Sequence, residues 1–570
     1  MMTKYLKIGI SEILAFTLIL AAVILRLILI SLGWPLRNSD EGIIGIMALH
    51  IAYQGAHPIF YYGQDYMGSL QAFIAAGLFH LFGPSLFTLR LGLLLLFTLF
   101  LVSTYVLTRM LYSRSWALVT LILLGVGSSY VMTRELNAIG GYAETLTFGS
   151  LLFGLASGLV LTYQPLSSQR ARFYKRQTAY VAWGLIAGLG LWSDLVILPV
   201  VVMSGLVLLL FCWREFVRGP APLCLLTGLV IGAAPLIYFN IYTAPGSDSL
   251  TVLREIHGQG PTDVHSLLRS FLSTLHISIP MITGDPFCPV SELDFYSPGS
   301  PNTLRCTLER AWWGYGYILL LTAALGLAIG QLSHAWRNGR FVSAEKVTHQ
   351  FSLRLSALRL ALLGSAVLTL FFYVTSYAPL TAPGLFARYL ICLLIATPAV
   401  FWPLWQGIES MLRALSTKGG SSLLVRARGG FCSVALAVVC MILLYGAGHT
   451  FTEVPSVRTT NARDQHLIES LLRAGTTHIY SDYWTCYTLD FLSKERVVCA
   501  VVNIDLRRGR NRYQPYWNIV SADPHAIYIF PRSSSEIDMS AVEKSIATSG
   551  RTFELLLVDD YVLYIPQGGM

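Results

Sequence analysis

Charged residues are scarce in this sequence. They make up 12% of the 570 residues, whereas 54% of the residues are hydrophobic and the mean hydropathy is +0.59. Soluble globular domains carry about 25% charged residues, so this composition excludes a wholly water-soluble protein. Apolar runs of roughly 20 residues, the length that crosses a bilayer, recur from the N-terminus to about residue 450. The sequence therefore predicts a multi-pass membrane protein.

Acidic residues are fewer than basic ones, 31 against 40, which gives a formal net charge of +9. A basic excess can indicate a nucleic-acid partner. Here, however, the basic residues gather in short loops between the apolar runs, which is the pattern of cytoplasmic loops in membrane proteins. We therefore expect a lipid bilayer, and no nucleic acid, as a partner of this chain.

Eleven apolar segments lead us to expect about eleven transmembrane helices. Their approximate bounds are 8–32, 86–112, 116–133, 144–163, 179–193, 195–212, 222–243, 312–331, 357–377, 387–406 and 431–449. When the N-terminus is placed in the cytoplasm, every inner loop is basic, beginning with Arg109 and Arg114. The opposite orientation would place all these basic loops outside, so we expect a cytoplasmic N-terminus.

Residues 34–85 then form a long first outer loop. The apolar core of 65–83 is short for a span, and counting it as one would invert every later loop and break the charge rule. We expect two short helices in this loop, at about 40–54 and 66–82, lying on or dipping into the outer membrane surface.

After residue 450 the composition becomes mixed polar and aromatic. Helical spacing at 464–475 and five short strand-like runs predict a small α/β domain. The runs are "HIYSDY", "RVVCAVV", "AIYIF", "TFELLLV" and "YVLYI". We therefore expect a transmembrane domain over 1–449 and an extracytoplasmic α/β domain over 450–570. The aromatic "DYWTCYTLDF" segment suits a core helix or carbohydrate stacking.

The nine cysteines show no spacing typical of a zinc site. Cys288 and Cys306 share one expected outer loop, and Cys486 and Cys499 share the C-terminal domain. Each pair is a candidate disulfide outside the reducing cytosol. The sequence does not tell whether the Cα atoms of either pair come close enough to be bridged.

Two adjacent acids, Asp40 and Glu41, follow the first apolar run in "RNSDEG" (37–42). Ser39 is a suitable N-cap, and acids in a first helical turn complement the helix dipole. The same position would also suit a general base or a cation ligand at the membrane surface. Arg26, in the outer third of the first span, needs a partner, either an acid of this loop or a lipid phosphate.

Several stretches resemble glycosyltransferases of the C superfamily, in particular the protein O-mannosyltransferases and the lipid A aminoarabinose transferase. "SDEG … YQGAHPIFYYGQDYMGSLQAFIAAGLFHLFGPSLFTLRL" (39–91) is similar to their first outer loop and second span. Fainter similarities lie in "GGYAETL" (140–146), "GLGLWSDLVILP" (188–199), "ARYL" (387–390) and "IYSDYWTCYTLDFLS" (479–493). The resemblance implies transfer of a mannose-like hexose from a polyprenyl-phosphate donor to an extracytoplasmic acceptor, with inversion.

The resemblance also implies residue roles. An acid early in the first outer loop of these enzymes acts as base or metal ligand, and the matching residue is Asp40, with Glu41 beside it. Whether a divalent cation such as Mg²⁺ or Mn²⁺ takes part is left open. The leaving phosphate needs a cation, for which Arg388 is the first candidate, with Arg134 and Arg90 similarly placed.

Further candidates for substrate binding are Glu144, Tyr62 and Asp65, although Tyr62 also suits an interfacial aromatic belt. An alternative function is a transporter or flippase of a lipid-linked saccharide. That function favours ionisable residues at the bilayer midplane and repeated halves, and no clear repeat is present. An enzyme should instead bring Asp40, Glu144 and an arginine into one outer-facing cavity. The acceptor, whether protein, glycolipid or polymer, stays open.

Overall fold

The computed structural model describes residues 9–164, 170–244, 246–256, 260–287, 304–338, 346–416, 423–533 and 537–567. The chain forms two compact units. The first unit comprises Met1–Leu25, Leu96–Arg134 and Tyr142–Thr450. The second unit comprises Arg26–Leu95, Glu135–Gly141 and Phe451–Met570. The first outer loop is therefore grouped with the C-terminal residues, whereas the predicted boundary at 449/450 stays a prediction.

Six helices of the described ranges are long and apolar enough to cross a membrane. They are α1 (Ile10–Ser31), α4 (Leu86–Leu111), α7 (Tyr142–Leu161), α16 (Leu304–Asn338), α17 (Lys346–Val374) and α22 (Leu423–Arg473). Two bent pairs raise the number to eight. They are α5 (Arg114–Gly125) with α6 (Ser129–Leu136), bent by 89°, and α11 (Ala221–Gly232) with α12 (Ala234–Tyr242), bent by 67°. The chain is a multi-pass membrane protein, and the count of eleven stays a prediction.

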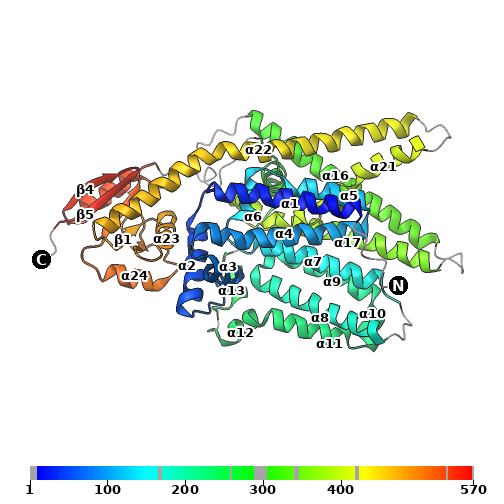
Figure 1. The fold of residues 1–570 in the computed structure, drawn as a ribbon, viewed down its shortest axis with the longest axis horizontal. Coiled ribbons are helices and arrows are strands. Elements are labelled where there is room, and N and C mark those ends of the chain that lie inside the picture. Colours follow the sequence, from blue (N-terminus) through cyan, green and yellow to red (C-terminus); the bar gives the residue numbers. More distant parts are fainter. Residues whose placement is uncertain are drawn as a thin grey trace. The chain divides into compact units, whose positions relative to one another are not determined.

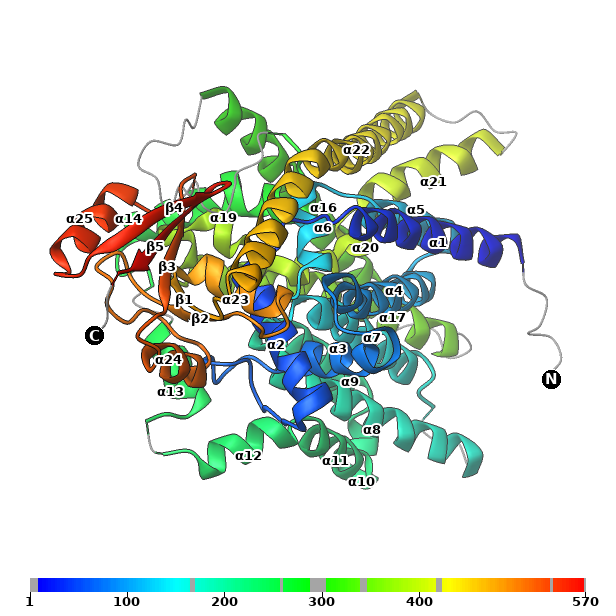
Figure 2. The same cartoon turned by 60° about the vertical axis from the view of Figure 1, so that its left-hand side comes forward.

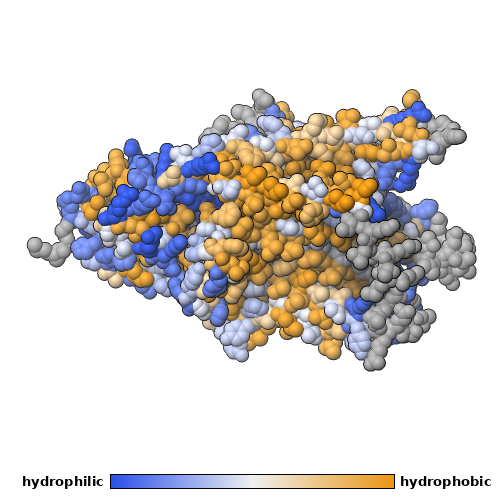
Figure 3. All heavy atoms as spheres, in the orientation of Figure 1, coloured by the Kyte–Doolittle hydropathy of each residue, from blue (hydrophilic) through white to orange (hydrophobic). Residues whose placement is uncertain are grey.

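Large apolar side chains are exposed on α1 and α4. Examples are Ile10, Phe16 and Leu20 on α1, with Leu95 and Leu99 on α4. Figure 3 shows largely hydrophobic surface over these helices, whereas hydrophilic and hydrophobic surface are mixed over the C-terminal part. Exposed apolar side chains of this density suit contact with lipid chains rather than with water.

The first unit also contains further helices. These are α8 (Arg170–Ser193), η1 (Leu195–Ile197), α9 (Leu198–Phe211), α10 (Trp213–Arg218), α13 (Ser249–Ile256), α14 (Val264–Ser273), η2 (Thr274–Ser278), α15 (Ile279–Thr283), α18 (Ala378–Thr381), α19 (Pro383–Phe386), η4 (Ala387–Leu394), α20 (Thr397–Val400) and α21 (Trp402–Ser416). Glycines let α8 and α11 approach closely: a Cβ on Gly184 would meet the carbonyl oxygen of Leu225, and one on Gly228 would meet that of Val181. Small residues four apart are the usual device for close helix packing in membranes.

The prediction of one continuous span over 387–406 is wrong. The segment is divided among η4, α20 and the start of α21. Prolines explain the division, because Pro398 and Pro403 each stand in the first turn of a new helix, where their missing N–H group costs no hydrogen bond.

The second unit contains the two predicted loop helices, α2 (Ser39–Gln54) and α3 (Leu70–Phe82). It also contains the C-terminal α/β fold, in which all five predicted strands are confirmed (Figures 1 and 2). The strands are β1 (His478–Ser481), β2 (Val498–Val501), β3 (Ile527–Pro531), β4 (Phe553–Val558) and β5 (Tyr561–Pro566), and the helices are α23 (Tyr483–Leu492), α24 (Gln514–Ser521) and α25 (Met539–Thr548). The sheet order is β2-β1-β3-β5-β4. β1 pairs in parallel with β2 and β3, whereas β5 is antiparallel to β3 and β4.

The last turns of α22 belong to the second unit. The sequence predicted a span ending near 449 and a separate helix at 464–475, but one helix of 51 residues covers both. Its C-terminal part is held to the sheet and to the first outer loop. The Tyr561 hydroxyl donates to Asp464 at 2.7 Å, and Arg37 Nε donates to the same carboxylate at 3.1 Å.

A disulfide between Cys486 and Cys499 links α23 to β2, which confirms one of the two predicted pairs. The two Cα atoms are 5.1 Å apart, and both cysteines are fully buried. Cys288 lies outside the described residues, so the other pair stays a prediction.

The disulfide closes a short loop, with a sequence separation of 13 residues. Cross-links of this loop length stabilise folded proteins by about 3 kcal/mol. We therefore expect replacement of both Cys486 and Cys499 by serine to lower the free energy of unfolding by about this amount, measured by denaturant unfolding in detergent. The control is Cys440→Ser, which removes a free cysteine. Equal stability of the two variants would contradict the prediction.

Candidate functional site

The N-terminus of α2 is capped by Asn38, not by Ser39 as the sequence suggested. The Asn38 side chain accepts a hydrogen bond from the Glu41 backbone N–H at 2.9 Å. The Ser39 hydroxyl instead donates to the carbonyl oxygen of Tyr483. Because asparagine is as good a cap as serine, the helix needs neither Asp40 nor Glu41 for capping. Their side chains are engaged elsewhere.

Glu41 forms a bidentate ion pair with Arg90. Arg90 Nε and Nη2 donate to the two carboxylate oxygens at 2.8 and 2.7 Å, and both residues are fully buried. Arg90 Nη2 also donates to the side chain of Asn137 at 3.2 Å. Two residues expected to act on the substrate therefore bind each other, and their geometry suits a structural role.

A second buried pair joins Arg26 to Glu135. Arg26 Nε and Nη2 donate to Glu135 Oε2 at 2.9 and 2.5 Å. The arginine thus has an acidic partner, as expected, although the acid comes from α6 and not from the first outer loop. A paired guanidinium removes the cost of burying an isolated charge next to an apolar helix.

Asp40 is held by two tyrosine hydroxyls. The Tyr483 hydroxyl donates to Asp40 Oδ1 at 2.5 Å, and the Tyr61 hydroxyl donates to the same oxygen at 3.2 Å. Hydroxyl-to-carboxylate bonds of about 2.5–2.7 Å are typical of charge-assisted hydrogen bonds. Among the residues that the structure describes, no hydrogen bond reaches Asp40 Oδ2. Asp40 is half-buried, so that oxygen is available to a substrate.

Arg512 completes this group, which we call the Asp40 cluster: Asp40, Tyr61, Tyr483 and Arg512. Arg512 Nε donates to the Tyr483 hydroxyl oxygen at 3.1 Å, and its guanidinium carbon lies 5.5 Å from the Tyr61 ring centroid. Burial by itself would lower the pKa of Arg512. Its interactions with Tyr483, Tyr61 and Asp40 outweigh burial and raise this pKa above the ordinary value. The guanidinium therefore stays charged and donates its protons.

Sequence reasoning missed Tyr483 and Arg512. Tyr483 is 443 positions from Asp40, and no local spacing connects them. The signals near Tyr483 were the aromatic "DYWTCYTLDF" segment, which indicated a core helix or a stacking surface, and the faint resemblance of residues 479–493 to related enzymes. The segment is indeed a core helix, with Cys486, Tyr487 and Phe491 buried. Tyr483, the first residue of α23, nevertheless reaches Asp40.

Tyr62, a predicted substrate-binding residue, belongs to a different group. Its hydroxyl lies 2.9 Å from His50 Nδ1, and His50 Nε2 lies 2.8 Å from Glu495 Oε1. The Tyr516 hydroxyl donates to the same Glu495 oxygen at 2.7 Å. Asp65 is exposed in the loop that follows Tyr62. We call His50, Tyr62, Glu495 and Tyr516 the His50 cluster.

Three further predicted residues belong to the first unit. Arg134 lies with its guanidinium carbon 5.0 Å from the Tyr130 ring centroid, and Arg388 lies 5.9 Å from the Tyr142 ring centroid. Tyr130 interacts electrostatically with both arginines, so the two are brought into one neighbourhood. Glu144 is buried in the first turn of α7, two residues after Tyr142. The convergence of Glu144 with Asp40 stays a prediction.

The residues around Asp40 in the second unit do not fit a divalent cation. No group of three or more His, Cys, Asp or Glu residues within the described ranges is placed to hold a metal ion. Mg²⁺ and Ca²⁺ need six or more oxygen ligands in all, several of them anionic or carbonyl oxygens. Asp40 instead meets two hydroxyl donors, which compete for its lone pairs, and the guanidinium of Arg512 behind Tyr483 adds positive charge nearby.

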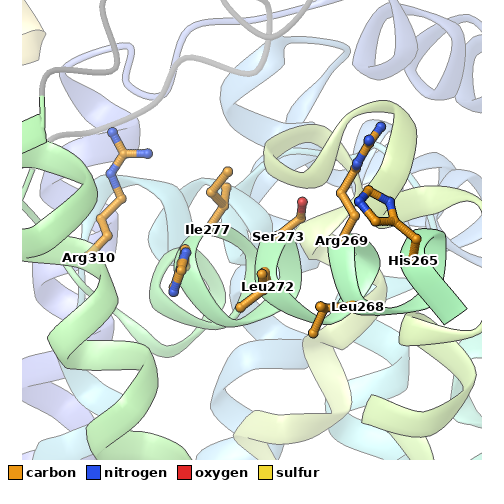
Figure 4. Close-up of a pocket in the computed structure, with 8 residues that line it drawn as sticks. His265, Leu268, Arg269, Leu272, Ser273, Ile277 and Arg310 are labelled. Atoms are coloured by element: carbon orange, nitrogen blue, oxygen red, sulfur yellow. The ribbon is translucent and has the colours of Figure 1, made fainter.

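A cavity of about 350 Å³ lies in the first unit and contains none of the predicted site residues. It is lined by His265, Leu268, Arg269, Leu272, Ser273, His276, Ile277 and Arg310. Figure 4 shows Arg269 and His265 on α14, with Arg310 on α16.

The Glu41–Arg90 pair generates a stability prediction. Removing one partner of a buried pair leaves an uncompensated charge, which costs about 3–5 kcal/mol. We therefore expect Arg90→Met to lower the free energy of unfolding by about this amount, measured by denaturant unfolding in detergent. The double variant Glu41→Gln with Arg90→Met removes both charges of this pair and should recover most of the loss. Additive losses in the double variant would contradict the interpretation.

The His50 cluster generates a pH prediction. Burial raises the pKa of Glu495, but hydrogen bonds from His50 and Tyr516 and the charge of His50 outweigh burial and hold the pKa below its ordinary value. A carboxyl group with a lowered folded pKa stabilises the fold above its unfolded pKa, and this stability is lost as the pH falls through the folded pKa. Unfolding midpoints measured between about pH 6 and pH 3 should therefore fall less steeply for Glu495→Gln than for wild type.

The matched control is Glu543→Gln, which replaces an exposed carboxyl group of α25. This variant should keep the wild-type dependence on pH. If the unfolding midpoint of Glu495→Gln fell with pH as steeply as that of wild type, the prediction that Glu495 stabilises the fold through its lowered pKa would be contradicted.

Comparison with solved structures shows one shared fold. ArnT from Cupriavidus metallidurans in the apo state is 13% identical, with 96% of this chain and 97% of that chain covered and a TM-score of 0.55. ArnT bound to undecaprenyl phosphate is 12% identical over 96% and 97% of the two chains, with a TM-score of 0.53. The archaeal oligosaccharyltransferase AglB from Archaeoglobus fulgidus, in complex with an inhibitory peptide and a dolichol-phosphate, is 12% identical over 96% and 72%, with a TM-score of 0.50.

No protein-family model matches the sequence, and no curated protein sequence matches it. At these low identities the likeness concerns the fold, which extends over nearly the whole chain. The likeness expected from "SDEG" and the segments that follow it is thereby confirmed at the level of the fold: this chain has the fold shared by ArnT and the oligosaccharyltransferase AglB.

Proposed function

We propose that this chain is a membrane glycosyltransferase that moves a mannose-like hexose from a polyprenyl-phosphate donor to an acceptor hydroxyl. The observation that carries the proposal is Asp40, whose Oδ1 is held by two hydroxyl groups and whose Oδ2 is available, in a chain with this fold. The neighbours support the donor class, because one ArnT structure holds undecaprenyl phosphate and the AglB structure holds a dolichol-phosphate.

The proposed reaction is a single inverting displacement. The acceptor oxygen attacks the anomeric carbon, and its proton passes to Asp40 Oδ2 as the new C–O bond forms. The bond between the anomeric carbon and the phosphate oxygen breaks, and its electron pair leaves with the polyprenyl phosphate. General-base assistance of this kind accelerates reactions by about 10²- to 10⁴-fold.

The leaving phosphate gains negative charge and needs cations. Arg134 and Arg388 are the proposed phosphate ligands, because both lie in one neighbourhood of the first unit. Arg90 is a weaker candidate than the sequence suggested, since Glu41 occupies two of its donors. Glu144 is proposed to orient a sugar hydroxyl. Arginine suits phosphate oxygens because its planar group donates two parallel hydrogen bonds.

We propose that Asp40 acts as a base rather than as a metal ligand, since its neighbours are hydrogen-bond donors. The basic inner loops support a cytoplasmic N-terminus and an extracytoplasmic face for Asp40 and residues 450–570. The acceptor is then an extracytoplasmic protein, glycolipid or polymer. The alternative remains a transporter or flippase of a lipid-linked saccharide.

The test uses the purified full chain in lipid with radiolabelled polyprenyl-phosphate mannose and glucose. Asp40→Asn keeps the size of the side chain but cannot accept the proton, so sugar transfer should fall by about 10²- to 10⁴-fold. The control is Asp505→Asn, which changes an exposed aspartate of the same unit and should transfer at the wild-type rate.

Transfer by Asp40→Asn at the wild-type rate, in a folded preparation, would remove Asp40 from the chemistry. Movement of intact lipid-linked sugar across the bilayer, without any transfer, would favour the flippase.

A further inference from the structure

We propose that Tyr483, from the C-terminal α/β domain, is a positioning residue that orients the Asp40 carboxylate for proton abstraction. The proposal rests on the proposed function, in which Asp40 is the base. It assigns to the C-terminal domain a part in the chemical step, in addition to any contact with the acceptor.

The direction of the Tyr483 proton follows from its partners. A tyrosine hydroxyl has one proton to donate, and a guanidinium can only donate. Because Arg512 Nε donates to the Tyr483 oxygen at 3.1 Å, the Tyr483 proton must point to another acceptor. The acceptor at 2.5 Å is Asp40 Oδ1. The chain Arg512–Tyr483–Asp40 therefore has only one arrangement of its protons.

The hydroxyl keeps its proton at working pH. Burial, followed by the negative charge of Asp40, raises the pKa of Tyr483, and the charge of Arg512 only partly offsets this. Tyr483 thus stays a neutral donor to Asp40. With Oδ1 taken by Tyr483 and Tyr61, the carboxylate cannot turn freely about its Cβ–Cγ bond, and Oδ2 is held as the basic oxygen.

Tyr483 stands on a rigid support. It is the first residue of α23, whose N-terminus is capped by Asp482 through backbone N–H groups at 2.8 and 3.2 Å. The Cys486–Cys499 disulfide fixes the same helix to β2. A catalytic group held by residues that are themselves fixed keeps the geometry its reaction needs.

α23 also packs directly on α2, which carries Asp40 (Figures 1 and 2). The Ser39 hydroxyl donates to the Tyr483 carbonyl oxygen. A Cβ on Gly42 would meet the carbonyl oxygen of Tyr487, and one on Gly45 would meet the ring of Phe491. The glycines in "SDEGIIG" therefore allow the close contact that brings the Tyr483 hydroxyl to Asp40.

Tyr483→Phe tests the proposal, because phenylalanine keeps the ring contacts with Trp484 and Tyr487 and removes only the hydroxyl. We expect kcat for sugar transfer to fall by about 10- to 100-fold, the range for one lost hydrogen bond to a charged group. KM for the polyprenyl-phosphate sugar should stay within about twofold, because positioning of the base affects the chemical step. The control is Tyr480→Phe, which removes a hydroxyl that donates to the Val520 carbonyl oxygen at 3.4 Å in the same domain.

A double variant separates positioning from general damage. If Tyr483 acts through Asp40, Tyr483→Phe should cause no further loss in single-turnover transfer when Asp40 is already asparagine. Unfolding midpoints of Tyr483→Phe and Tyr480→Phe are measured alongside and should be similar.

Other results would overturn the positioning role of Tyr483, the proposed function, or both. Tyr483→Phe with the kcat of Tyr480→Phe, while Asp40→Asn is inactive, would overturn the positioning role and leave the proposed function intact. An additive loss in the double variant, or an equal change of kcat and KM, would also overturn it. No transfer by the wild-type chain from either donor would overturn both proposals.

Discussion

The buried ion pair between Glu41 and Arg90 is the interaction on which the geometry around Asp40 depends. Both groups are fully buried, so each needs the other, and the bidentate contact fixes the position and rotation of the first turn of α2. Asp40 is the preceding residue on that turn. Its direction is therefore set by the pairing of its neighbour, and the Arg26–Glu135 pair holds the end of α1 in the same way.

The two adjacent acids of "RNSDEG" therefore have different partners and different roles. Glu41 neutralises a buried guanidinium, whereas Asp40 receives neutral hydroxyl donors and keeps one oxygen available. The contrast has a physical cause: an arginine in direct contact would hold a carboxylate as an ion pair, but tyrosines orient it without supplying a countercharge. Arg512 is separated from Asp40 by one further hydrogen bond, because its Nε donates to the Tyr483 hydroxyl, and its charge acts through Tyr483. A carboxylate in this setting suits proton abstraction better than cation binding.

Patterns within a short stretch of sequence predicted most of the elements. The apolar runs, the two loop helices, the five strands and the Cys486–Cys499 pair all depend on neighbouring residues or on compartment. Two local predictions were wrong because competing residues were overlooked. Asn38 took the cap expected of Ser39, and prolines divided 387–406 into separate helices. α22 continued beyond the expected end of its span, because a single Pro455 did not stop it.

The sequence by itself determined a multi-pass membrane protein with a C-terminal α/β fold, because composition and periodicity carry that information, and the resemblance of the first outer loop pointed to the adjacent acids Asp40 and Glu41. The tertiary structure alone decided which acid is structural and which is available. It also brought Tyr483 and Arg512 to Asp40, since their partnership joins residues 443 positions or more apart and leaves no mark in local spacing. Side chains distant in sequence meet only through the packing of α2 against α23, and packing is a property of the whole fold.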